Sequence, residues 1–213
     1  MRRTAGFVPV ALLLSAACAT APPAVPLSAA DAEPWAARWE TRRAAAYGPR
    51  RLKALYKGEA APKVGVIARG YLSVWWDGVA LVWTASAPLA GDLRGGTLSA
   101  ASGGDSPLPG RLKAGDAIGA LLGVLDLPAG GRPVERVGDA VRIRLDAEGR
   151  EAVFGKDGRL TGLKFPDGTR IVLEPASPLP LRLDAAGPGG TASLVLQSWA
   201  DWPEGEAIPG GRA

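Results

Sequence analysis

Short segments in which apolar and polar residues alternate dominate the second half of this 213-residue chain. Within short segments between residues 134 and 199, apolar side chains recur at every second position, as at Val141, Ile143 and Leu145, and the turns Asp157-Gly158 and Asp167-Gly168 separate some of these segments. Alternation turns one face of a strand toward a core, and Asp-Gly favours tight turns between antiparallel strands. The pattern therefore predicts an antiparallel meander.

The strongest local signal is a hairpin in residues 62–86, PKVGVIARGYLSVWWDGVALVWTAS. Apolar residues share one face of its first strand: Val64, Val66, Ala68, Leu72, Val74 and Trp76. Asp77-Gly78 supplies a turn, and the return strand carries Val79, Leu81, Trp83 and Ala85. The other face is also apolar in part, so either both faces are covered or one of them lines a cavity.

Helical patterns are few. Residues 33–46, with Trp35 and Trp39 at helical spacing, predict one helix, and a shorter helical piece is expected from Pro49 to Tyr56. Residues 114–125 form a second amphipathic segment, with an apolar stripe made by Ile118, Leu121, Leu122 and Leu125. The expected fold class is mainly β with a few helices.

The N-terminus has the features of an export signal. About ten apolar residues follow Arg2 and Arg3, a run too short to span a bilayer. Ala16-Ala17 directly before Cys18 resembles the lipobox of bacterial lipoproteins, in which the cysteine is acylated after cleavage. The alternative is a secreted protein cut near Ala19 or Ala21 that discards the cysteine.

This interpretation divides the chain into four parts. Residues 1–17 are the expected signal peptide, 18–34 a tether rich in Ala and Pro, 35–203 the folded domain and 204–213 a flexible tail. Acyl chains on Cys18 would anchor the protein, because each buried methylene contributes about 0.8 kcal/mol. The resemblance to lipoproteins also implies the outer membrane, since the residue after Cys18 is not the aspartate that retains enteric lipoproteins in the inner membrane.

Composition excludes several kinds of chemistry. The chain has one cysteine and no histidine, which excludes a disulfide framework, a His-dependent triad and the commonest zinc sites. A net charge of +4 is too small to indicate a nucleic-acid partner. Ser106, in GGDSPLPG, lacks a histidine to activate it and is interpreted as a turn residue. Composition does not exclude lysine, carboxylate or serine chemistry, but we expect a protein that is not an enzyme and needs no cofactor or metal.

Two sequence blocks resemble the LolA/LolB-type lipoprotein carriers: GDAIGALLGVLDLP at 115–128 and PLPLRLDAAGPGGTASLVLQSWADW at 178–202. The resemblance covers residues 35–202 and implies a strongly curved, incomplete (half) β-barrel lidded by helices. It also implies binding of an acyl chain or a lipidated protein, received from a periplasmic carrier protein and passed to the outer membrane.

The candidate ligand-binding residues are apolar positions of the hairpin: Val64, Val66, Leu72, Val74, Trp76, Leu81 and Trp83. They could equally form an ordinary core, because large aromatic residues at one hairpin usually do. In that case the chain would be a structural or assembly accessory lipoprotein, which docks to an envelope complex through its outer surface without binding lipid.

Overall fold

The computed structural model describes residues 23–63, 68–87, 91–110, 112–127, 134–203 and 206. Four sequence predictions fall outside these residues: the signal peptide at 1–17, the lipidated Cys18, and the lining positions Val64 and Val66. The same holds for all of the tail at 204–213 except Glu206.

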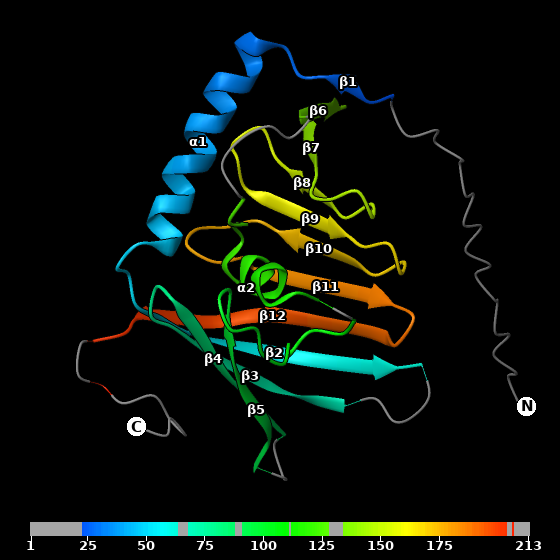
Figure 1. Ribbon diagram of the computed structural model, residues 1–213. Helices are drawn as coiled ribbons and strands as arrows, with labels where there is room; N and C mark the ends of the chain where they lie inside the picture. The colour runs from blue at the N-terminus through cyan, green and yellow to red at the C-terminus, as the bar shows by residue number, and fades with distance from the viewer. Residues whose placement is uncertain are drawn as a thin grey trace, which may run out of the picture.

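One antiparallel sheet of twelve strands forms most of the described structure, and it curves without closing (Figure 1). Its order is β1-β6-β7-β8-β9-β10-β11-β12-β2-β3-β4-β5. The strands are β1 (Val25–Pro26), β2 (Leu52–Pro62), β3 (Ala68–Trp76), β4 (Ala80–Ala87), β5 (Gly91–Ser99), β6 (Val134–Val137), β7 (Ala140–Arg144), β8 (Glu151–Phe154), β9 (Leu160–Lys164), β10 (Arg170–Glu174), β11 (Arg182–Gly187) and β12 (Gly190–Asp201). This confirms the predicted fold class, an incomplete barrel that is mainly β.

The predicted meander corresponds to β6 through β12, in which each strand pairs with the next. β12 is the longest strand, and it pairs along its length with β2, which brings the N-terminal hairpins to the end of the meander. The alternating residues Val141, Ile143 and Leu145 are all buried, as their period predicted.

The first helix, α1 (Ala29–Tyr47), confirms the helix predicted at 33–46 but begins earlier. Ser28 caps it, because its Oγ accepts a hydrogen bond from the backbone N of Asp31 at 3.2 Å. β1 precedes the helix and pairs with β6. The described fold therefore starts before residue 35, the boundary that the proline-rich composition suggested. No helix among the described residues has the length and hydrophobicity needed to cross a membrane.

The helical piece expected from Pro49 to Tyr56 is wrong. β2 begins at Leu52, and the side chains of Leu52, Ala54 and Tyr56 are buried at alternate positions. Pairing with β3 on one side and β12 on the other satisfies the backbone of this segment and overrides its helical propensity.

The second helix, α2 (Ala114–Leu122), lies over the concave face of the sheet, and α1 runs along one side (Figure 1). The apolar stripe Ile118, Leu121 and Leu122 is buried, as predicted. The helix ends before residue 125 because Gly123 adopts the left-handed conformation, with φ of 69°, and caps it.

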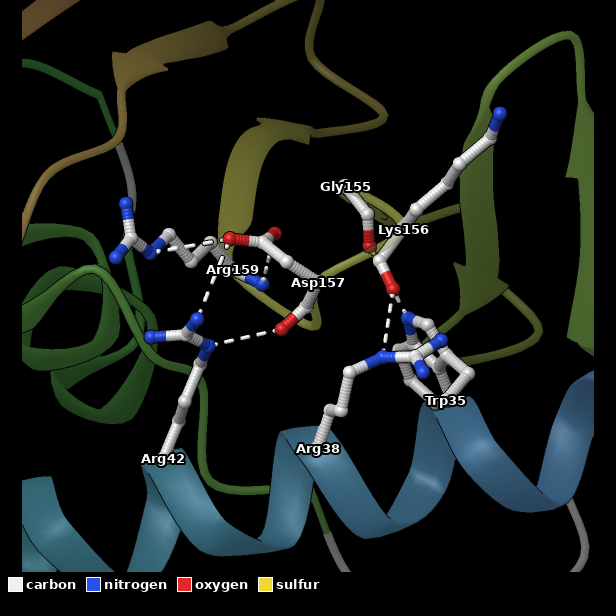
Figure 2. A network of polar contacts seen from close by, with 7 residues as sticks. All are labelled: Trp35, Arg38, Arg42, Gly155, Lys156, Asp157 and Arg159. Carbon is white, nitrogen blue, oxygen red and sulfur yellow. Dashed lines mark hydrogen bonds and ion pairs between the residues drawn. The ribbon is translucent and has the colours of Figure 1, made fainter.

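α1 is fixed to the turn between β8 and β9 (Figure 2). Trp35 Nε1, Arg38 Nε and Arg42 Nε donate to the carbonyl oxygens of residues 155, 156 and 157 at 3.3, 2.9 and 2.8 Å, respectively. The Asp157 carboxylate also pairs with Arg42 and with Arg159. Three successive turns of the helix are thus held by one β-turn.

Candidate functional site

The predicted lining residues that the structure describes lie on the concave face of β3 and β4. Leu72, Val74, Trp76, Leu81 and Trp83 are each no more than 4% exposed and belong to one hydrophobic core with the apolar face of α2. Of these five residues, Leu72 also borders an open space on the same face. A ligand-binding role for the set stays a prediction.

The two tryptophans are held by their ring nitrogens. Trp76 Nε1 donates to the carbonyl oxygen of Ala46 at 2.8 Å, and Trp83 Nε1 donates to that of Asp105 at 3.0 Å. The Trp83 ring lies over Gly96 of β5, where a Cβ would come within 3.1 Å of Trp83 Nε1. These side chains therefore fill this part of the half-barrel and fix the end of α1 and the loop before α2 to the sheet.

The turn of the same hairpin packs against the end of α1. The turn predicted at Asp77-Gly78 is present, and Val79 beside it is 71% exposed. Gly78 packs against the residue that ends α1: a Cβ added to it would lie 2.7 Å from the carbonyl oxygen of Gly48.

An open space lies farther along the concave face, toward the ends of β2 and β3. We call it the apolar hollow; it has a volume of about 140 Å³. Its floor and walls are formed chiefly by small and aliphatic residues: Gly58, Ala60, Ala68, Gly70, Leu72, Ala85, Pro107, Leu108, Ala192 and Leu194.

The hollow exists because side-chain size falls abruptly between neighbouring rows of the sheet. Tyr56 and Leu72 are cross-strand partners and fill the row beside the core, whereas the next rows pair Gly58 with Gly70 and Ala60 with Ala68. Leu194 leans over Gly58, at which a Cβ would lie 3.0 Å from Leu194 Cδ2. Because the paired positions carry only Gly or Ala, space remains above this part of the sheet.

The sequence analysis placed Ala68, Leu72 and Ala85 on the hairpin but named only Leu72 as a lining candidate, and it did not find the residues that other strands and the loop before α2 contribute to the hollow. A signal was present in the alternate small residues Gly58 and Ala60, but it falls just beyond the segment interpreted as helical. A charged rim borders the hollow, where Arg69 Nε donates to Glu59 Oε2 at 2.8 Å, and both side chains are exposed.

α2 is held over the core by a buried ion pair that the sequence did not reveal. Arg150 Nη1 contacts Asp116 Oδ2 at 2.5 Å and Arg150 Nε contacts Asp146 Oδ2 at 2.7 Å. Burial raises the pKa of Asp116, and Arg150 opposes that rise. The pKa of Asp146 is lowered, chiefly by the hydrogen bond that the Arg150 backbone N donates to it. α2 is also held by Tyr56, whose hydroxyl donates to the carbonyl oxygen of Leu121 at 3.3 Å.

No catalytic arrangement emerges around these groups. Ser106 Oγ accepts a hydrogen bond from the backbone N of Leu108 at 3.0 Å, as a turn residue does. Burial raises the pKa of the Tyr56 hydroxyl, so it remains a protonated donor. Within the described residues no group of three acidic, Cys or His side chains is placed to hold a metal ion.

Known proteins resemble the chain in fold but not in sequence. No family model and no curated protein matches the sequence. A LolA superfamily protein from Nitrosomonas europaea is similar in structure, with 10% identity, a TM-score of 0.48, and coverage of 79% of this chain and 94% of that one. A domain assigned to outer membrane lipoprotein sorting in Vibrio parahaemolyticus has 10% identity, a TM-score of 0.46, and coverage of 82% and 95%.

Proposed function

We propose that this protein is a lipoprotein of the bacterial outer membrane that binds an acyl chain, free or on a lipidated protein, and takes part in lipid or lipoprotein traffic. The proposal has two parts, an anchor at acylated Cys18 and a ligand site on the concave face of the sheet. The observation that carries it is the apolar hollow bordered by Leu72, Leu108 and Leu194.

The physical basis is transfer of hydrocarbon out of water. Each methylene buried in an apolar site contributes about 0.8 kcal/mol. The hollow, at about 140 Å³, holds roughly five groups of the size of a water molecule or a methylene. Filling it therefore contributes about 4 kcal/mol before the costs of binding, which suits a ligand that is taken up and released again.

Native mass spectrometry of residues 22–213 with palmitate tests the ligand site. We expect one palmitate per chain and a loss of binding in Ala60→Phe, which places a ring in the hollow. Ala61→Phe is the matched control, because the next residue of β2 faces the opposite side of the sheet. The proposal fails if palmitate does not bind to the unmodified chain, or if both variants bind it equally well.

A second function, docking to an envelope complex without lipid binding, is favoured by the other face of the sheet. A trough of about 1060 Å³ crosses β10, β11, β12 and β2 there. Small residues on its floor, among them Ala186, Thr191 and Ser193, lie between longer charged side chains on the flanking strands. Neither Lys57 nor Arg170 pairs with an acidic side chain among the described residues, so the trough suits an acidic segment of a protein partner.

A photo-crosslinker at Val195, inside the trough, tests this second function in cells. An envelope partner is supported if one crosslinked product forms and is lost in Lys57→Glu/Arg170→Glu, while palmitate binding by that variant is unchanged. A product that survives charge reversal contradicts an acidic partner in the trough.

A further inference from the structure

We infer that the apolar hollow takes a short length of a single acyl chain, so that its ligand is a single-chain amphiphile and not a triacylated lipoprotein. This inference rests on the proposed function, because it names the class of ligand for the same site.

Volume gives the first reason. Pockets that enclose most of a drug-sized ligand have volumes of roughly 300–1,000 Å³. The hollow has about 140 Å³, which accommodates roughly five methylenes. Three chains inserted side by side need several times that space, whereas one chain can enter with its methyl end.

The inner wall of the hollow is held in place by its neighbours. Leu72, at 4% exposed, separates the hollow from the filled core, and its cross-strand partner Tyr56 is tied to α2 by the hydrogen bond to Leu121. A wider cavity requires α2 to move off the core, which would separate Asp116 from Arg150. That movement would break an ion pair in which the Asp116 side chain is 7% exposed and the Arg150 side chain 17% exposed.

The opposite wall is also fixed. Leu108, buried at 4% exposed, closes the hollow from the side of the loop that precedes α2. The hydrogen bond from Trp83 Nε1 to the carbonyl oxygen of Asp105 holds this loop to the sheet, and the hydrogen bond from Leu108 N to Ser106 Oγ closes a turn within the loop. Both walls of the hollow are thus tied by specific polar contacts.

The remaining part of such a ligand stays outside the hollow. The rim carries the ion pair between Arg69 and Glu59, which is exposed to water. A polar headgroup and the rest of the chain would lie there, in contact with charged side chains and solvent. Palmitate and palmitoyl lysophosphatidylcholine share the single chain and differ in the headgroup, so together they separate chain recognition from headgroup recognition.

The test compares three probes by native mass spectrometry and by tryptophan fluorescence, each below its micellar concentration: palmitate, palmitoyl lysophosphatidylcholine, and a tripalmitoylated cysteinyl peptide. We expect binding of the two single-chain probes at one per protein, and binding of the triacylated peptide that is weaker by at least about tenfold. If the triacylated peptide binds as tightly as palmitate or more tightly, this inference is wrong and the proposed function stands. If no probe binds, the proposed function itself fails, and the inference fails with it.

A chain-length series provides an independent measurement. For saturated fatty acids, affinity should rise about fourfold per methylene over roughly five methylenes and then level off, because further methylenes remain in water. Ala192→Leu reduces the volume of the hollow, so the affinity should stop rising at a shorter fatty acid. Thr191→Leu, on the opposite face of the sheet, should leave the chain length at which the affinity levels off unchanged. A rise that continues up to about sixteen carbons would contradict a short insertion.

Discussion

Replacement of Arg150 by methionine tests whether the buried ion pair holds α2 on the sheet. In the folded protein the Arg150 side chain is 17% exposed and contacts Asp116, which is 7% exposed, so Arg150→Met leaves a buried carboxylate without its cation. Removal of one partner of a buried pair costs about 3–5 kcal/mol. We expect a loss of about 3 kcal/mol in the free energy of unfolding at neutral pH, since the partial exposure of Arg150 admits some water.

The pH dependence of this loss follows from the sign of the pKa shift. Burial raises the pKa of Asp116 in the fold, so protonation of this group favours the folded state. Arg150 is the main influence that lowers this pKa, and without it the folded value rises further. The deficit of Arg150→Met should therefore be smallest in acid, where Asp116 is protonated, and should grow as the pH rises through the folded pKa.

Urea unfolding followed by tryptophan fluorescence, at about pH 5 and at neutral pH, measures both effects. Arg142→Met is the control, because Arg142 and its partner Glu135 are each about 30% exposed and such pairs contribute at most about 1 kcal/mol. If the two variants lose the same stability at both pH values, the ion pair to α2 has no special structural role and the reasoning is refuted.

Three further predictions concern other parts of the chain. Gly158→Ala should destabilise more than Gly168→Ala, as measured by thermal unfolding, because both glycines have φ near +80° but only at Gly158 does a Cβ meet the backbone of Trp39, at 2.8 Å; equal losses would contradict docking of α1 on this turn. Trp76→Ala should cost about 3–5 kcal/mol in urea unfolding, since the ring is 1% exposed, and a loss under about 1 kcal/mol would show that the core collapses around the deletion. Cys18→Ser should abolish incorporation of labelled palmitate and release the protein from the membrane fraction, whereas retention of the label would refute the anchor at Cys18.

The repeated short strands were predictable because they depend on local information. Period-2 alternation and Asp-Gly turns act within about ten residues, and the structure places β6 to β12 in that order. The segment from Pro49 to Tyr56 was not predictable in this way, because one of the two strands that β2 pairs with is β12, about 140 residues later in the chain. Local propensity cannot report a partner so distant in sequence.

Polar contacts between elements that lie far apart in the sequence were also not predictable. In the sequence, Asp116 lies at the start of the helical segment 114–125, where an acidic residue is favourable without a partner. Its burial and its contact with Arg150, on the far side of the β7–β8 turn, arise from the way α2 lies across the sheet. The charge pattern of either segment alone is typical of solvated surface.

The location of the hollow shows why apolar patterning alone does not reveal where open space lies. Alternation identifies which side chains face inward, and Leu72, Val74 and Trp76 do face inward, but a face becomes a cavity only where inward side chains are too small to meet across it. Trp76 and Trp83 are large enough to fill the half-barrel, so the strongest apolar signal marks its most solid part. Space remains where inward positions are Gly or Ala, at Gly58 and Ala60. In an open sheet of this kind, open space arises from a fall in side-chain volume along a buried face, and Leu72 lies at that transition.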